Sequence, residues 1–211
     1  MTKTELKADI LKLFSTPVVM AHLPEAETVN AALKETILAR AEGDPGTQHS
    51  NLGGWQSTWD METWGGEALQ QVLKAARSLA NSMTVTREGQ PAKARWRINC
   101  WANVNRSGEA NEFHTHPGAF WSGSYYVDDG GIGEDPKLGG AFEVQDPRGV
   151  APAMYAPNLT FAGPGGPSLG ASYTLHPRSG MMILFPSWLQ HAVRPYRGRE
   201  MRISIAFNLS L

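Results

Sequence analysis

The sequence predicts an α+β fold that is mainly β, in which helices pack outside a sandwich or barrel of antiparallel strands. Three observations lead to this prediction. Apolar residues recur at helical spacing up to about residue 90, and from about residue 92 they alternate with polar residues. Glycine (22 residues) and proline (14 residues) concentrate after residue 105, where short strands need turns. The 211 residues suit one domain, with residues 1–90 as mainly helical support and residues 91–211 as the barrel.

Three helices are expected in the first part of the chain, over about residues 3–14, 24–41 and 65–83. Pro24 suits the first turn of the second helix. The segment between the second and third helices, residues 42–66, is too polar for a core and too aromatic for a plain linker. The apolar stripes of the three helices are, in order, Leu6, Ile10, Leu11 and Phe14; Val29, Leu33, Ile37 and Leu38; and Leu69, Val72, Leu73, Ala76, Leu79 and Ala80.

Strands are expected in the second part of the chain, where apolar residues alternate or run together between turn residues. The segment RWRINCWANV alternates, and MMILF is a continuous apolar run of the kind found in a fully buried strand. Six or more strands are expected, within residues 95–104, 112–116, 120–127, 139–147, 181–185 and 201–211.

The last of these strands, MRISIAFNLSL, has one apolar and one polar face. Its apolar side can be buried against the helices, while Arg202 and Ser204 lie on the opposite side. A strand that is apolar toward the helices and polar toward the inside implies a barrel that holds a polar ligand. The apolar face comprises Met201, Ile203, Ile205, Phe207 and Leu209, and the polar face Arg202, Ser204, Ala206, Asn208 and Ser210.

Composition and charge exclude several classes of protein. The net charge is −1 with scattered Lys and Arg, which argues against a nucleic-acid or anionic-membrane surface. No stretch reaches the ~18 consecutive apolar residues of a membrane span, and the charged start MTKTELKADILKLF is unlike a signal peptide. We therefore expect a cytoplasmic protein. The one cysteine, Cys100, allows no internal disulfide and is expected in the core.

Ligand-type side chains gather in NEFHTHPGAF. In an extended chain Glu112, His114 and His116 point to the same side, and the two histidine α-carbons lie roughly 6.5 Å apart. One metal ion can be held by both histidines. His191 follows 75 residues later, after a buried strand and a proline turn, and can supply a third ligand that leaves other coordination positions open. The remaining histidines are expected on the surface or in the core without a metal: His22, His49 and His176.

Arg202 heads an Arg-x-Ser unit on the polar face of the last strand. A guanidinium inside a barrel needs an anionic partner, because an unpaired buried charge is costly. Two partners are open at this point: a carboxylate of the protein, or the carboxylate of a small ligand that is also hydrogen-bonded by Ser204.

Taken together, these residues resemble the Fe(II)/2-oxoglutarate-dependent oxygenases, in particular the prolyl-hydroxylase-like branch and a bacterial and phage group. The resemblance extends from about Ser50 to Asn208, and its most specific parts are HTHPGAFWSGSYYV and FPSWLQHAV. The motifs that carry it occur in the order Ser50–Ser57 (SNLGGWQS), His114-x-His116, Tyr125–Val127, Gly139–Phe142, Gly180–Phe185, His191 and Arg202-x-Ser204.

The resemblance implies a double-stranded β-helix, the jelly-roll or cupin-like barrel, with Fe(II) at its open end. It places His114 and His191 on the iron, and Arg202, Tyr126 and Ser204 on the distal carboxylate of 2-oxoglutarate. The implied activity is that of a dioxygenase. With O₂ as the second co-substrate, 2-oxoglutarate is decarboxylated to succinate while a C–H bond of the primary substrate is hydroxylated.

One position departs from the pattern of this family. The usual iron ligands are two histidines and a carboxylate, and His116 stands where the carboxylate is expected. Either His116 is the third ligand, or a carboxylate comes from elsewhere, with Glu112 the first alternative and Glu143 and Asp128 more distant ones. We expect His114, His116 and His191 to hold the metal.

Two other functions fit part of this pattern. A cupin-like metalloenzyme shares the barrel and the HxH pair, but it needs a Glu four to six residues later, where this chain has GAFWS at residues 118–122. A non-catalytic barrel that binds a metal or a carboxylate is the second. The primary substrate, a small molecule or a protein, cannot be read from the sequence. The amphipathic segment at residues 3–14 is suited to an interface in a homodimer.

Overall fold

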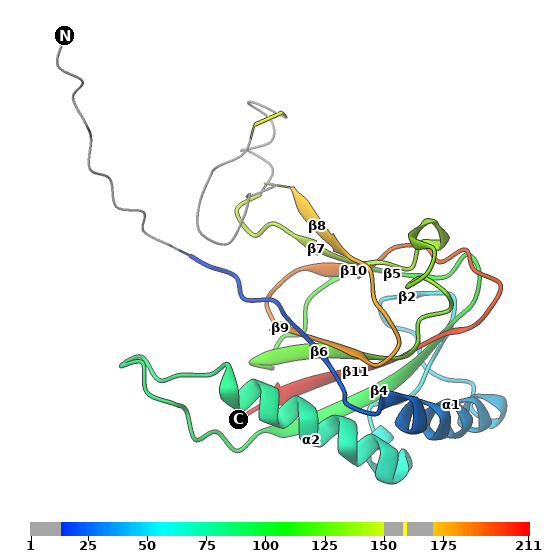
Figure 1. The fold of residues 1–211 in the computed structure, drawn as a ribbon, viewed down its shortest axis with the longest axis horizontal. Coiled ribbons are helices and arrows are strands. Elements are labelled where there is room, and N and C mark those ends of the chain that lie inside the picture. Colours follow the sequence, from blue (N-terminus) through cyan, green and yellow to red (C-terminus); the bar gives the residue numbers. More distant parts are fainter. Residues whose placement is uncertain (1–13, 150–157, 160–170) are drawn as a thin grey trace.

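The computed structural model describes residues 14–149, 158–159 and 171–211 (Figure 1). These residues form helices α1 (Ala26–Gly43) and α2 (Gly66–Ser82), and the short 3₁₀ helices η1 (Met61–Thr63) and η2 (Pro136–Leu138). The strands are β1 (Val19–His22), β2 (Asn51–Leu52), β3 (Trp55–Gln56), β4 (Arg97–Asn105), β5 (Ala110–His114), β6 (Trp121–Asp128), β7 (Phe142–Gln145), β8 (Ser172–Leu175), β9 (Met181–Pro186), β10 (His191–Val193) and β11 (Arg202–Ser210).

The strands form two antiparallel sheets. Sheet A has the order β1-β9-β6-β11-β4-β3, and sheet B has the order β2-β5-β10-β7-β8. Within the short segment 51–56 the chain passes from one sheet to the other, because β2 pairs with β5 and β3 pairs with β4. The last strand, β11, lies between β4 and β6 and pairs with both. The structure is therefore mainly β, as the sequence predicts, and two of the three expected α-helices lie in the described part.

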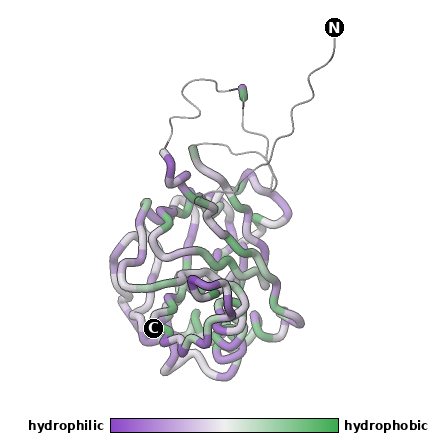
Figure 2. The backbone as a smooth tube through the Cα atoms, turned by 90° about the vertical axis from the view of Figure 1, so that its left-hand side faces the viewer, coloured by the Kyte–Doolittle hydropathy of each residue, from purple (hydrophilic) through white to green (hydrophobic). Residues whose placement is uncertain are grey.

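The largest core lies between sheet A and the helices (Figure 1). On α1 the stripe Val29, Leu33 and Ile37 is buried, and α2 buries a matching stripe. The predicted apolar face of β11 enters this core. Figure 2 shows how apolar and hydrophilic stretches alternate along the chain. The residues of β11 on this face are fully buried: Ile203, Ile205, Phe207 and Leu209. The opposite face of sheet A is thus left free for polar side chains.

A smaller apolar cluster joins sheet B to β6 and β9. It brings the inner faces of the two sheets together, because its members come from both. They are Tyr126, Phe142, Val144, Leu175, Met181, Ile183, Phe185 and Leu189.

Most predicted elements are present within one to three residues of their expected ends. Helices over about 24–41 and 65–83 correspond to α1 and α2, and the six expected strands correspond to β4, β5, β6, β7, β9 and β11. The helix expected over residues 3–14 lies outside the described residues apart from Phe14. Neither described helix has the length and hydropathy that a membrane span requires. Cys100 is buried in the main core, as expected.

One local prediction was wrong. The sequence suggested that Glu112, His114 and His116 project from the same strand, but β5 ends at His114. His116 lies in the turn that follows, where its backbone N–H donates to the carbonyl of Ser187. Pro117 directly after it has no N–H for a ladder hydrogen bond, and Gly118 has a positive φ of 90°, so the extended chain cannot continue.

Candidate metal and carboxylate site

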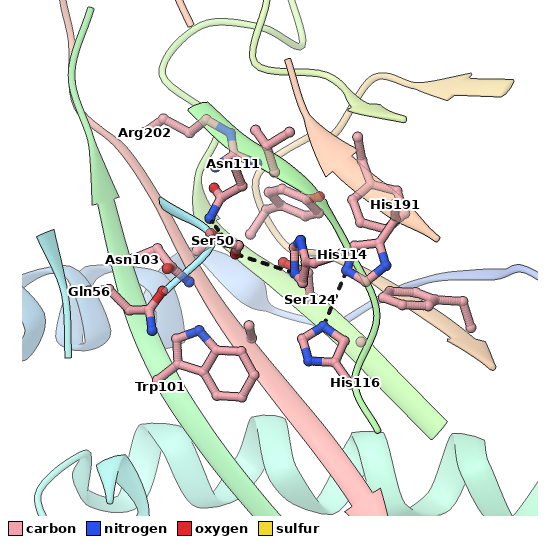
Figure 3. A pocket seen from close by; sticks show the side chains of 17 residues that line it. Ser50, Gln56, Trp101, Asn103, Asn111, His114, His116, Ser124, His191 and Arg202 are labelled. Carbon is pink, nitrogen blue, oxygen red and sulfur yellow. Dashed lines mark hydrogen bonds between the residues drawn. The ribbon is translucent and has the colours of Figure 1, made fainter. Parts of the chain in front are cut away.

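Three histidines meet at one end of a pocket between the two sheets (Figure 3). His114 ends β5 and His191 begins β10, and these two residues are register partners. His116 reaches them from the turn after β5, with its Nε2 3.2 Å from Nε2 of His191. One ligand nitrogen from each ring lies within 4.8 Å of the other two, so a single metal ion can be held by all three.

Main-chain carbonyls fix the orientation of two of these rings. His114 Nδ1 is 2.7 Å from the carbonyl oxygen of Glu112, and His191 Nδ1 is 2.8 Å from that of Leu189. Because a carbonyl can only accept, both Nδ1 atoms carry the proton and both Nε2 atoms keep a lone pair. Such second contacts orient imidazole ligands in metal sites generally. The third ring, of His116, packs beside the Trp101 ring with centroids 5.6 Å apart.

Burial keeps the three imidazoles neutral. Burial, with a smaller contribution from the neighbouring His114, lowers the pKa of His191 to about 3 and that of His116 to about 4. Burial also lowers the pKa of His114, against a smaller opposite effect of its hydrogen bond to Glu112. A metal ion therefore competes with few protons for these nitrogens at neutral pH.

Carboxylates are absent from the histidine cluster, as far as the structure describes the chain. The Glu112 side chain is exposed, and only its carbonyl group takes part in the site. Glu143 pairs with Arg194 at 3.2 Å, and Asp128 pairs with Lys34 at 2.7 Å. Each of the carboxylates considered from the sequence thus lies outside the cluster.

Arg202 lies at the other end of the pocket and is 1% exposed. Its Nη1 donates to Oδ1 of Asn105 at 3.1 Å, and its guanidinium carbon lies 5.2 Å from the centre of the Tyr126 ring. Two buried atoms, Arg202 Nε and Tyr126 Oη, have no hydrogen-bond partner among the described residues. Burial lowers the pKa of Arg202 and raises that of Tyr126, although each group opposes the shift of the other.

These two orphan groups are suited to an anion. Leaving a buried donor unpaired costs about 1–3 kcal/mol, and a carboxylate could accept from both Arg202 and the tyrosine hydroxyl. Ser204, buried beside them, is the register partner of Tyr126. The sequence left two partners open for Arg202, a carboxylate of the protein or that of a ligand. In the described chain the hydrogen-bond partner of the guanidinium is a neutral amide and not a carboxylate, which favours the ligand.

The pocket is also lined by residues to which the sequence had assigned no role. Some of them lie in motifs quoted for the resemblance, but amides, hydroxyls and tryptophans on a strand do not by themselves indicate a site. These residues are Ser50, Gln56, Trp101, Asn103, Asn111 and Ser124.

The comparison with protein families decides the class of the protein. A family model with the description "Putative 2OG-Fe(II) oxygenase" matches residues 99–208, more than half of the chain. The chain belongs to this family. It is an oxidoreductase that uses Fe(II) and 2-oxoglutarate, with O₂ as co-substrate, and this favours the oxygenase over the cupin-like and non-catalytic alternatives. No curated protein matches the sequence at a significant level.

Solved structures of such oxygenases have the same fold. A prolyl-4-hydroxylase from Pseudomonas putida is 19% identical, with 94% of each chain covered and a TM-score of 0.63. A prolyl hydroxylase from Trichoplax adhaerens, in complex with a peptide fragment of hypoxia inducible factor, is 13% identical over 92% of this chain and 83% of its own, with a TM-score of 0.63. HygX from Streptomyces hygroscopicus, with nickel and 2-oxoglutarate bound, is 14% identical over 92% and 83%, with a TM-score of 0.59.

The residues present in this oxygenase fit both cofactors. Three neutral imidazoles converge as a metal requires, and an unpaired guanidinium nitrogen and an unpaired hydroxyl face the other end of the same pocket. 2-Oxoglutarate carries a metal-chelating 2-oxo acid at one end and a carboxylate at the other. The presence of two unlike sites in one pocket matches such a ligand.

Proposed function

We propose that this oxygenase hydroxylates a C–H bond of a peptide or small-molecule substrate, with Fe(II) held by His114, His116 and His191. Arg202 and Tyr126 bind the distal carboxylate of 2-oxoglutarate. Ser204 lies beside them and adds a hydrogen bond. The observation that carries the proposal is the single pocket that joins three neutral imidazoles to an arginine with no anionic partner in the described chain.

The two sheets enclose this pocket as a double-stranded β-helix. Support comes from the residues that line it, since His114 and His191 belong to sheet B, whereas Tyr126 and Arg202 belong to sheet A. Residues 1–211 act as one domain in this proposal, because α1 and α2 share a continuous core with sheet A.

Each part of the chain has a distinct task in this reaction. When bound, Fe(II) and 2-oxoglutarate supply the oxidising chemistry, in which decarboxylation to succinate and CO₂ is coupled to hydroxylation. The imidazoles offer neutral lone pairs and add no negative charge to the metal. Arg202 fixes the distal carboxylate, which orients the other end of the 2-oxo acid toward the histidines. Phe142 and Phe185 pack on the His191 ring, with centroids 5.2 and 4.5 Å away, and exclude water from that side.

The nature of the primary substrate stays open between two classes. The Trichoplax adhaerens relative was solved with a peptide, whereas other structural relatives, such as the carbocyclase SnoK, belong to the biosynthesis of nogalamycin. With both kinds among enzymes of the same fold, the fold alone does not choose between them.

The proposal is tested by binding of 2-oxoglutarate to the protein loaded anaerobically with Fe(II), followed by the visible charge-transfer band of the complex. Wild type should give the band. In Arg202→Ala the affinity for 2-oxoglutarate should fall about 100-fold or more, because charge-assisted hydrogen bonds contribute about 1.5–3 kcal/mol each. His116→Ala should lose affinity for Fe(II) itself.

Two matched controls accompany these variants. His176→Ala and Arg199→Ala remove an exposed histidine and an exposed arginine outside the pocket, and both should behave as wild type. Wild-type protein that binds Fe(II) without giving the band would contradict the proposed site. If His116→Ala keeps both its iron and the band, the third ligand lies elsewhere, and Glu112 is the next residue to change.

A further inference from the structure

We propose that Gln56, Asn103 and Trp101 form a subsite for the primary substrate and recognise a neutral amide group, as in a carboxamide or a peptide bond. This inference rests on the proposed function, because it places the substrate beside the proposed iron ligands. These three residues form one wall of the pocket, in which the two amides lie across from the histidines and Trp101 lies beside His116 (Figure 3).

The wall is built by strand register. Gln56 on β3 pairs with Asn103 on β4, and Asn103 pairs with Ser204 on β11, which in turn pairs with Tyr126 on β6. Neighbouring strands lie about 4.8 Å apart, so these four side chains form a continuous polar row across the inner face of sheet A. Trp101 lies two residues before Asn103 on β4 and so shares its face.

The two amides of the wall are buried but have no partner in the described protein. Gln56 is 3% exposed and Asn103 is 8% exposed, and both side chains line the pocket. Neither side chain makes a hydrogen bond to another described residue, whereas Asn111 in the same pocket donates to Ser50. Buried amides are normally paired. Two of them directed into one cavity indicate that a ligand completes their hydrogen bonds.

The wall adjoins the 2-oxoglutarate end at Asn103, the register partner of Ser204, and extends away from it. Tyr126 lies on the β6 side of β11, and the amides lie on the opposite side, on β4 and β3. The Trp101 ring reaches the histidine end, since it packs beside the ring of His116. A group bound to this wall therefore lies next to the metal ligands while Arg202 and Tyr126 remain available to the co-substrate.

The chemistry of the lining selects the kind of group. The residues that line the pocket include no Asp or Glu, so an ammonium group would find no counter-ion there. The one permanent cation, Arg202, is assigned to 2-oxoglutarate. Each carboxamide of the wall both donates and accepts, and a group that matches two of them must do the same. A neutral amide has this property, and it is planar, as is the Trp101 ring.

Three small probes test this inference: N-acetylglycinamide, which is neutral, N-acetylglycine, which is anionic, and glycinamide, which is cationic. Protein loaded with Mn(II) and saturated with 2-oxoglutarate is titrated with each probe, and the paramagnetic relaxation of the probe protons is measured by NMR. Wild type should relax the neutral probe most strongly. Gln56→Leu and Asn103→Leu should each weaken its binding roughly 3- to 10-fold, as expected for one lost neutral hydrogen bond.

The control is Asn99→Leu, on the same strand and face but exposed and outside the pocket, which should bind the probe as wild type does. Equal relaxation of the neutral probe by wild type and both variants, or none by wild type, would overturn the subsite. If instead the two variants lose affinity for 2-oxoglutarate, the amides belong to the carboxylate end, and the subsite is again refuted. Failure of the proposed function has a different signature, which is the absence of the 2-oxoglutarate band in wild type itself.

Discussion

The two faces of the nine-residue strand β11 differ in what their buried side chains do. On the outer face Ile203, Ile205 and Phe207 are fully buried against the helical side of sheet A. On the inner face Arg202 and Ser204 are about as buried, but they line the pocket. There Nε of Arg202 and the hydroxyl of the neighbouring Tyr126 have no hydrogen-bond partner among the described residues. Burial alone therefore does not distinguish a structural position from a ligand position. The difference lies in whether the protein itself satisfies the buried group.

The largest effect should follow from a change on the outer face. Phe207→Ala should lower the free energy of unfolding by about 3–5 kcal/mol, as for other buried phenylalanines replaced by alanine. The ring of Phe207 packs so closely on Gly123 that a Cβ at residue 123 would lie 2.4 Å from it. Because the surroundings are this tightly packed, we expect them to fill little of the cavity that the substitution leaves. Urea unfolding of the metal-free protein measures the loss.

Phe14→Ala is the matched control, because that side chain is 92% exposed and its removal should change stability by no more than about 0.5 kcal/mol. The fraction of Phe207→Ala that remains folded should still bind 2-oxoglutarate with nearly the affinity of wild type. A large loss of affinity in that fraction would show that the two faces are not independent.

A change beside the inner face should alter binding and stability in opposite directions. Asn105 is the register partner of Arg202 and its neutral acceptor. Asn105→Asp supplies an internal counter-ion, so 2-oxoglutarate should bind at least about tenfold more weakly, while the metal-free protein gains about 1–2 kcal/mol from the new ion pair. Calorimetric binding and urea unfolding give the two values.

The control for this variant is Asn208→Asp, on the inner face of β11, whereas Asn105 lies on the neighbouring strand β4. Oδ1 of Asn208 accepts from Ser122 at 2.7 Å, away from the pocket lining. It should leave the affinity for 2-oxoglutarate unchanged. If Asn105→Asp binds 2-oxoglutarate as tightly as wild type, the neutrality of the arginine's partner is irrelevant to the site.

The smallest effect concerns pH. In the folded, metal-free protein the pKa of His191 is about 3 and that of His116 about 4, below the ordinary value near 6.5. The unfolded chain therefore binds more protons below pH 6.5, and stability is complete above that pH and falls as the pH drops toward 4. When the pH falls from 7.5 to 5.5, each of these histidines should lower the free energy of unfolding by on the order of 1 kcal/mol.

Unfolding at the two pH values separates this effect from packing. His191→Gln should reduce the loss of stability on acidification, because a titrating group is removed. Ile205→Val, on the outer face of β11, should lower stability by a similar amount at both pH values. An unchanged pH dependence in His191→Gln would mean that the buried imidazole is not the source of the effect.

The sequence predicted the fold well where its signal was periodic. The stripes of α1 and α2 and the alternation in β4 and β11 were sufficient, because amphipathic elements show their buried face directly. The short strands β2, β3 and β10 were not predicted, since two or three residues cannot show a period. β1 and β8 were not predicted either, because they lie at sheet edges, where most of their residues are half-buried or exposed.

The candidate site was predictable only in part, for a similar reason. The HxH pair, the later histidine and the Arg-x-Ser unit stand out as residue types. Gln56 and Asn103 do not, because an amide in a polar register usually faces water. Their importance depends on cross-strand pairing between β3, β4 and β11, and that pairing joins segments about 50 and 100 residues apart, which no local pattern reveals.

The central place of β11 in sheet A bears on how the molecule is made. Synthesis on the ribosome delivers β11 after all the other described strands, yet β4 and β6 meet only through it. Until it emerges, the growing polypeptide presents two unfinished sheet edges and an incomplete core, and it lacks Arg202, the proposed ligand of the co-substrate. A prematurely terminated product would therefore have the three histidines proposed to bind iron, but not the arginine proposed to hold 2-oxoglutarate. We expect such fragments to be substrates for chaperones and proteases, and to be unable to carry out misdirected oxidation.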